Sequence, residues 1–318
     1  MRFTVLLSGA VLCACASCST LRQAPPAHAD ILIDDTAVYP ESMDAAPDGT
    51  VYVGSIKGTV FRAAPGADRA EPWVAPSPAN GILALFGVLV DAPHGTLWLC
   101  STPTPLTRPP KVGISALLAL DLATGTLRGR YPLPPPASVC NDITIARDGT
   151  AFASDTANGR IFTLSPGARE LQLFASDPRL KGIDGIVFGA DGTLYANIVS
   201  RNRLVRIARH ADGSFADVVE LATSQPVLAP DGFRLIAGNR FLLAEGNGGR
   251  VDEVTIEGDA ARVRVLRAGL VSPPGVAHAG RTAYAIEGKI GYLFDPRLRG
   301  KDPGPFRVYE LPLPPSME

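Results

Sequence analysis

The sequence predicts a six-bladed β-propeller, and three observations support that prediction. A strand–turn–strand pattern recurs six times, at intervals of 42 to 54 residues along the 318-residue chain. Four-stranded propeller blades repeat at about this spacing. The chain is rich in turn residues, with 32 Gly and 29 Pro, and 46% of its residues are hydrophobic. No segment shows a long helical period of 3.6 residues, so a layered α/β fold is not expected.

Each repeat is centred on a tight turn of the type that joins two antiparallel strands. A short apolar strand precedes the turn, as at 143–146, and a second strand follows it, as at 51–53. A third strand follows another turn, as at 59–61, and a less regular fourth strand completes the unit, as at 170–174. The six central turns are Asp48-Gly49-Thr50, His94-Gly95-Thr96, Asp148-Gly149-Thr150, Asp191-Gly192-Thr193, Gly238-Asn239-Arg240 and Gly280-Arg281-Thr282.

The ends of the chain are expected to close the ring within a single domain spanning residues 31–318. Residues 306–311 alternate at the two-residue period of a strand and are expected to pair with an early strand such as Ile31–Ile33. A Pro/Thr-rich insertion at 103–110 is expected to form a long loop over one face.

The first residues have the pattern of an export signal. Arg2 precedes an apolar stretch that is too short for a permanent membrane span. The favoured interpretation is a lipoprotein signal over residues 1–18, with Cys18 as the lipidated residue and 19–30 as a tether. Cleavage after Ala29 and a buried N-terminal helix are the alternatives. The protein is therefore expected in the periplasm or at the outer membrane as a lipoprotein, or secreted.

Cys100 and Cys140 are the two cysteines beyond the signal segment. They fall in different repeats, and their separation does not decide between a disulfide and two free thiols. Two buried free thiols are the favoured interpretation.

The charge balance and the residue types limit the partners. A net charge of −1 leaves no basic footprint for nucleic acid. The partner expected is a small molecule, with membrane contact only through the lipid anchor, and the protein is expected to be a monomer. The four histidines lack metal-ligand spacing.

Four repeats place an oxygen-bearing side chain just before their first strand. Because the first strands of propeller blades line the central channel, these side chains are expected to converge at one end of it. Carboxylates gathered in this way repel one another unless they are protonated or bind a cation, and all-oxygen ligands suit Ca²⁺, Mg²⁺ or Mn²⁺. Each Asp-Gly pair taken alone is more often only a turn. The four residues are Glu41, Asn141, Asp184 and Asp231.

The chain resembles the senescence-marker-protein/gluconolactonase family over residues 39–294. The motifs that carry the resemblance are Pro40-Glu41, Asn141-Asp142, Ile183-Asp184-Gly185, Pro230-Asp231-Gly232 and Asn247-Gly248-Gly249-Arg250-Val251.

The resemblance implies a six-bladed propeller with one divalent cation in its channel. Glu41 and Asp231 would be metal ligands, and Asp231 would also be the general base. Asn141 would face the metal or the substrate, while Asp142 is a candidate for substrate binding. Asp184 stands where the family has a ligand Asn, which adds a negative charge to the site. Ca²⁺ is the favoured ion, with Mg²⁺, Mn²⁺ or Zn²⁺ as alternatives.

The function predicted from these residues is a metal-dependent lactonase, in which the cation polarises the ester carbonyl and a carboxylate activates water. The chain contains no Gly-x-Ser-x-Gly motif that would indicate a serine nucleophile. A non-catalytic exported binding propeller is the alternative, followed by a lyase or isomerase on the same scaffold. Asp142 and Asp155 are candidate supports of the site, and Asp48, Asp148 and Asp191 are interpreted as structural turn residues.

Overall fold

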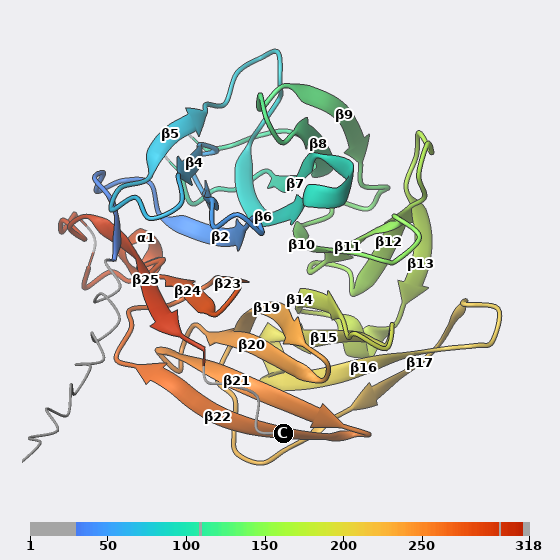
Figure 1. The fold of residues 1–318 in the computed structure, drawn as a ribbon. Helices are drawn as coiled ribbons and strands as arrows, with labels where there is room; N and C mark the ends of the chain where they lie inside the picture. The colour runs from blue at the N-terminus through green and yellow to red at the C-terminus, as the bar shows by residue number, and fades with distance from the viewer. Residues whose placement is uncertain (1–29, 108–109, 299, 314–318) are drawn as a thin grey trace, which may run out of the picture.

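The computed structural model describes residues 30–107, 110–298 and 300–313, and in them the predicted propeller is confirmed. Six small antiparallel sheets surround a central channel (Figure 1). The innermost strands are β2 (Pro40–Ala45), β6 (Ala84–Asp91), β10 (Cys140–Ile145), β14 (Ile183–Phe188), β19 (Pro230–Ala237) and β23 (Val276–Ala279).

Each blade continues outward through three further strands. The second strands are β3 (Val51–Ser55), β7 (Thr96–Thr102), β11 (Ala151–Asp155), β15 (Leu194–Ile198), β20 (Arg240–Glu245) and β24 (Thr282–Ile286). The third strands are β4 (Val60–Ala63), β8 (Ala116–Asp121), β12 (Arg160–Leu164), β16 (Arg203–Arg209), β21 (Arg250–Glu257) and β25 (Phe306–Pro312). The outer strands are β5 (Glu71–Val74), β9 (Leu127–Pro132), β13 (Gln172–Ser176), β17 (Phe215–Glu220), β22 (Ala260–Ala268) and β1 (Ile31–Ile33).

The remaining elements are short. Strand β18 (Ala222–Thr223) adds a parallel edge to β22. The helical segments are η1 (Ala92–His94), η2 (Pro178–Leu180), η3 (Val199–Arg201) and α1 (Gly291–Phe294). In the part of the chain that the structure covers, no helix has the length and apolar character needed to cross a membrane.

The ring closes as expected, by pairing the two ends of the chain. Strand β1 is antiparallel to β25, with Ile31 opposite Val308 and Ile33 opposite Phe306. Blade six therefore takes its outer strand from the start of the chain and its other three strands from the end. The cleavage and lipidation predictions at Cys18 and Ala29 lie outside the described residues.

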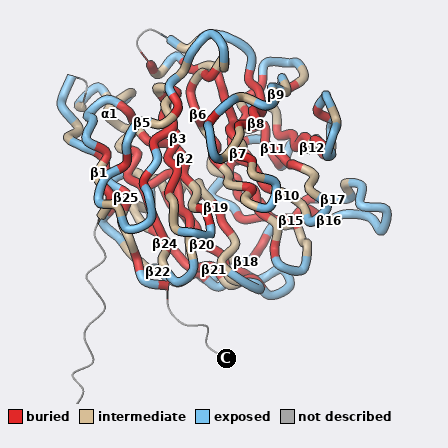
Figure 2. The backbone as a smooth tube through the Cα atoms, turned by 45° about the horizontal axis from the view of Figure 1, so that its top comes forward, coloured by how far each residue is buried: buried red, intermediate tan, exposed pale blue. Residues whose placement is uncertain are grey.

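The hydrophobic core is divided among the junctions between neighbouring blades. At one junction Phe152 of blade three contacts Phe174 in its own blade and Phe188 in blade four, with both pairs of ring centroids 5.1 Å apart. Figure 2 shows the buried residues concentrated in the strands and the exposed ones in the loops. The packing of blade on blade thus fixes the inner strands that carry the polar side chains.

The preference for two free thiols is wrong, because Cys100 and Cys140 form a disulfide with their Cα atoms 5.1 Å apart. Strand β7 carries Cys100, and β10 of the next blade begins at Cys140. Gly87, which is paired with Cys100 in the register of β6 and β7, allows this approach. A Cβ atom at Gly87 would lie 2.2 Å from the carbonyl oxygen of Asn141.

Candidate functional site

The predicted ligands lie at equivalent positions of four inner strands. Glu41, Asn141, Asp184 and Asp231 are each the second residue of their strand, in β2, β10, β14 and β19. Because the inner strands occupy equivalent places in successive blades, these side chains lie at one end of the channel. Glu41, Asn141 and Asp184 are buried, with exposed fractions of 8%, 5% and 6%, and Asp231 is half-buried.

The carboxyl groups at this end of the channel affect each other's protonation. Burial raises the pKa of Glu41 well above its usual value, and the charges of Asp231, Asp184 and Asp142 raise it further. Burial also raises the pKa of Asp184 to about 7, with Asp142 adding to the shift and the Asn141 amide opposing it. The pKa of Asp231 is raised by burial and then by Asp184 and Asp142. Such shifts are typical of carboxylates brought together away from water.

The chemistry of the donor set suits a hard divalent cation, although no tight ligand shell is formed. Within residues 30–313, apart from the undescribed positions, no group of three His, Cys, Asp or Glu side chains is arranged to hold a metal ion. Two buried oxygen atoms in this region nevertheless have no hydrogen-bond partner, Oε2 of Glu41 and Oδ1 of Asn197. Buried acceptors without donors are costly, and a cation would satisfy them. The residues present therefore fit a cation held by oxygen atoms.

Hydroxyl groups in and just after strand β11 support the candidate ligands of blades three and four. Thr156, just after β11, accepts a hydrogen bond from the Asn141 amide at 2.9 Å and donates one to the Ile183 carbonyl at 2.6 Å. Ser154 donates to the Asp184 carbonyl at 2.9 Å. These bonds connect two neighbouring blades at the level of the site.

Gly185 lets two inner strands approach each other closely. A Cβ atom at this position would lie 2.4 Å from the Asp231 carbonyl oxygen and 2.6 Å from Nδ2 of Asn197. The Asn197 side chain, which is fully buried, donates to that same carbonyl. The glycine after Asp184 therefore has a packing role in bringing Asp184 close to Asp231.

Asp142 faces across the channel. Its two carboxylate oxygens accept hydrogen bonds from Arg234 at 2.7 and 2.9 Å, and one of them also accepts the Ile186 amide at 3.1 Å. Because both of its oxygens are bound in this way, Asp142 affects the candidate ligands through its charge, which raises the pKa of Glu41, Asp184 and Asp231.

The other candidate aspartates have structural roles. Asp155 is fully buried, pairs with Arg160 at 2.8 Å and accepts the Val139 amide at 2.9 Å, so it holds the loop that leads into β10. The turn residues Asp48, Asp148 and Asp191 each accept the amide of the Thr two positions later, at 2.8 to 2.9 Å. This confirms their structural interpretation.

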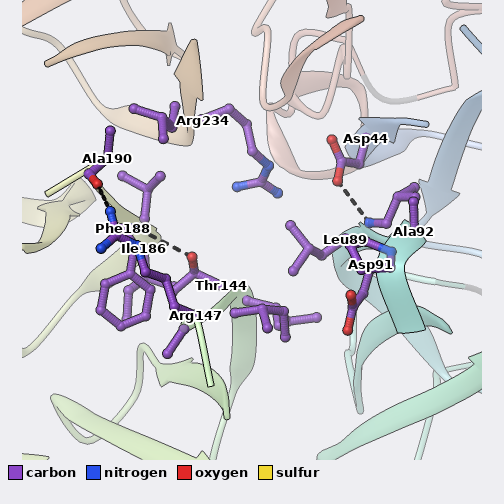
Figure 3. A pocket seen from close by; sticks show the side chains of 18 of the residues that line it. Asp44, Leu89, Asp91, Ala92, Thr144, Arg147, Ile186, Phe188, Ala190 and Arg234 are labelled. Atoms are coloured by element: carbon purple, nitrogen blue, oxygen red, sulfur yellow. Dashed lines mark hydrogen bonds between the residues drawn. The ribbon is translucent and has the colours of Figure 1, made fainter. Parts of the chain in front are cut away.

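A separate cavity of about 1020 Å³ opens at the other end of the channel, where the inner strands finish. Its walls include Ile145, Phe188 and Leu235, with Asp44 on one side and Arg147 on another (Figure 3). Arg234 lines this cavity while its guanidinium group binds Asp142. It therefore lies between the cavity and the carboxylate end of the channel.

Arg234 and Asn197 are the site residues that sequence reasoning missed. Asn197 lies in a second strand, where the repeat pattern gives no reason to expect a side chain that reaches the channel. Arg234 follows the Pro230-Asp231-Gly232 motif by two residues. The one feature that could have indicated its role is that an arginine stands inside a strand predicted to line the channel.

Comparisons with known proteins agree with this fold. A family model described as strictosidine synthase-like, N-terminal, matches residues 27–63. No curated protein matches the chain.

Several solved propellers resemble the chain over most of its length. The calcium-binding protein regucalcin from Agrobacterium tumefaciens is 17% identical, with 90% of this chain and 95% of that one covered and a TM-score of 0.63. A gluconolactonase from Xanthomonas campestris is 19% identical, with 88% of each chain covered and a TM-score of 0.62. Virginiamycin B lyase from Staphylococcus aureus is 17% identical, with 88% and 82% covered and a TM-score of 0.60. The predicted resemblance to gluconolactonase-type proteins is thus confirmed at the level of the fold.

Proposed function

We propose that the protein is a divalent-cation-dependent hydrolase of the lactonase type. One observation carries the proposal: four oxygen-bearing side chains from four blades lie at one end of the channel, and burial and mutual repulsion raise the pKa of three of them. Such a cluster is poised either to bind a cation or to transfer a proton near neutral pH. The gluconolactonase and regucalcin propellers among the structural relatives support this function.

Glu41, Asp184, Asp231 and the carbonyl oxygen of the Asn141 side chain would hold the cation, and Ca²⁺ is favoured because every donor is an oxygen atom. The bound cation would polarise the carbonyl of a cyclic ester and stabilise the negative charge that develops on it. Asp184 adds a carboxylate where the resemblance expects an amide, which strengthens the attraction for a cation.

Asp231 is the candidate general base. It is half-buried, so water can reach it, and its raised pKa makes it a stronger proton acceptor than an ordinary aspartate. It would accept a proton from the water whose oxygen attacks the ester carbonyl carbon. The carbon–oxygen bond of the ring then breaks, and the departing alkoxide takes up the proton that Asp231 accepted, which gives a hydroxy acid and restores the Asp231 carboxylate.

A non-catalytic binding propeller is the second candidate, and the cavity at the opposite end of the channel is the observation that favours it. A cavity of about 1020 Å³ with apolar walls has the size of small-molecule sites. In that case the carboxylate end of the channel would have a structural role only.

The proposed setting is outside the cytoplasm, with the protein anchored through a lipid on Cys18 or secreted, and acting as a monomer. The Cys100–Cys140 disulfide supports an oxidising compartment, because structural disulfides are rare where thiols are kept reduced.

The test combines metal content with turnover in the purified mature protein. Wild type is expected to bind one Ca²⁺ by calorimetry and to open a ring in a panel of sugar and aliphatic lactones followed by acid release. E41Q and D231N should each weaken Ca²⁺ binding at least tenfold and remove turnover. D191N, which changes an aspartate of a surface turn, is the matched control and should behave as wild type. Unchanged metal binding and turnover in both E41Q and D231N would reject the proposal.

A further inference from the structure

Arg234 is a buried arginine inside the channel, and the proposed reaction gives it no role. Only 7% of its surface is exposed. It extends from β19 towards the centre of the channel, as Figure 3 shows. An arginine in such a place must be held by acceptors, because a buried unpaired charge is strongly unfavourable.

The acceptors of Arg234 are oxygen atoms from three different blades. Asp142 of blade three supplies two carboxylate oxygens at 2.7 and 2.9 Å. The Val88 carbonyl of blade two accepts at 3.2 Å, and the carbonyl of Phe233 in blade five accepts at 2.9 Å. The two terminal nitrogens of the guanidinium therefore bind a bidentate carboxylate and two main-chain carbonyls, whereas its buried Nε has no hydrogen-bond partner.

These four oxygens are also the kind of ligand set that Ca²⁺ binds in proteins, namely carboxylates and backbone carbonyls. They come from β6, β10 and β19, so whatever occupies this position ties three blades together across the channel. Asp44, further along the channel, also interacts with the positive charge of Arg234, which counteracts the effect of burial on the Asp44 pKa.

We propose that Arg234 is a permanent internal cation of the propeller, occupying a position that a second divalent ion would otherwise take and limiting the channel to one exchangeable ion. The count of one exchangeable ion rests on the proposed function. The four oxygen atoms around Arg234, which we call the oxygen cradle, do not depend on it. The charges at the carboxylate end of the channel agree with this assignment. Glu41, Asp142, Asp184 and Asp231 carry four negative charges when ionised, and Asp44 lies further along, at the cavity end. One divalent ion and Arg234 offset three of the four, which leaves a net charge of −1 at the carboxylate end.

The arrangement also has a consequence for apo stability. A covalently attached cation cannot be removed by a chelator, so the link between blades two, three and five persists without metal. Only the proposed cation site at the carboxylate end of the channel, near Glu41, would exchange ions with the solvent.

The test is the number of Ca²⁺ ions bound per chain, measured by equilibrium dialysis and calorimetry on the full mature protein. Wild type should bind one ion. R234A empties the oxygen cradle and should bind two, with a larger rise of the melting temperature on adding calcium chloride. R234K keeps the positive charge and should stay at one ion. D142N/R234A removes the carboxylate of the cradle and should return to one.

A matched control is R206A, because Arg206 makes an exposed ion pair with Asp259 far from the channel. It should keep the stoichiometry of wild type. A folded R234A that binds the same number of ions as wild type overturns the inference. If wild type binds none and R234A binds one, the proposed function fails while the cradle inference stands; if neither binds Ca²⁺, both fail.

R234A could also fail to fold without metal, and that outcome is informative. Refolding in calcium chloride should then restore the native circular dichroism spectrum, whereas potassium chloride of equal ionic strength should not. Failure of Ca²⁺ to restore a protein that folds as D142N/R234A would overturn the inference.

Discussion

Removing the bridge between Cys100 and Cys140 should destabilise the protein by an amount that follows from the loop it closes. The two cysteines are 40 residues apart in the chain. The entropy of closing a loop of this length in the unfolded chain corresponds to about 4 kcal/mol at 25 °C. In a protein of this size that corresponds to a fall of roughly 6 °C in the melting temperature. The C100A/C140A variant is therefore expected to unfold at clearly lower urea concentration than wild type.

The assay is urea unfolding followed by the fluorescence of the two tryptophans, Trp73 and Trp98, of which Trp98 lies on the same strand as Cys100. The slope of the transition should become steeper in the variant, because an unbridged chain exposes more surface when it unfolds. A reductant should lower the stability of wild type by the same amount and leave the variant unchanged. A difference below about 1 kcal/mol would contradict the loop-entropy reasoning, because the bridge would then restrict the unfolded chain too little to change the free energy of unfolding.

Further predictions concern buried carboxyl groups and one glycine. Burial and the neighbouring Glu245 raise the pKa of Asp252 to about 8. Because the folded protein favours the protonated carboxyl, the stability that Asp252 contributes is lost as the pH rises from the pKa of the unfolded chain through 8. D252N should therefore melt higher than wild type at pH 9 but not at pH 4. The stability contributed by Asp184, whose pKa is raised to about 7, should be lost with rising pH in the same way. In EDTA, D184N should therefore become more stable than wild type as the pH rises from 4 to 7, and excess Ca²⁺ should make wild type the more stable protein again. A stability advantage of D184N that grows as the pH falls would contradict the raised pKa. G87A should lower the free energy of unfolding by about 1–3 kcal/mol through overpacking, since the new Cβ would lie 2.2 Å from the Asn141 carbonyl; calorimetry showing a melting temperature equal to wild type would refute this.

The repeat pattern predicted the fold because turns and strands are determined locally. The Asp-Gly-Thr turns depend on a carboxylate that binds an amide two residues away, as Asp48 does at 2.8 Å, and this bond can be anticipated from three adjacent residues. The closing strand at 306–311 was also predictable. Its apolar and polar residues alternate as in a strand, a strand needs a pairing partner, and residues 31–33 at the start of the chain have the residue types of one.

The contacts that cross the channel could not be predicted in the same way. Arg234 and Asp142 are 92 residues apart, and nothing in either local sequence indicates that their side chains meet. The Cys100–Cys140 bridge depends on how closely two blades approach at Gly87, which is a property of the packed ring. Local sequence therefore predicted the positions of the candidate ligands, whereas their charge balance required the assembled structure.

The pairing of β1 with β25 affects the order in which the site can assemble. Glu41 stands in the first blade and Asp231 in the fifth, and blade six, which joins them around the ring, is complete only when the two ends of the chain meet. Contacts between such distant segments are expected to form late in folding, because the loop between them must first be closed. The repulsion of Glu41 by Asp231, Asp184 and Asp142 is thus added when the ring closes. A cation bound to Glu41 and Asp231, as proposed above, would offset this repulsion and so stabilise the ring that β1 and β25 close.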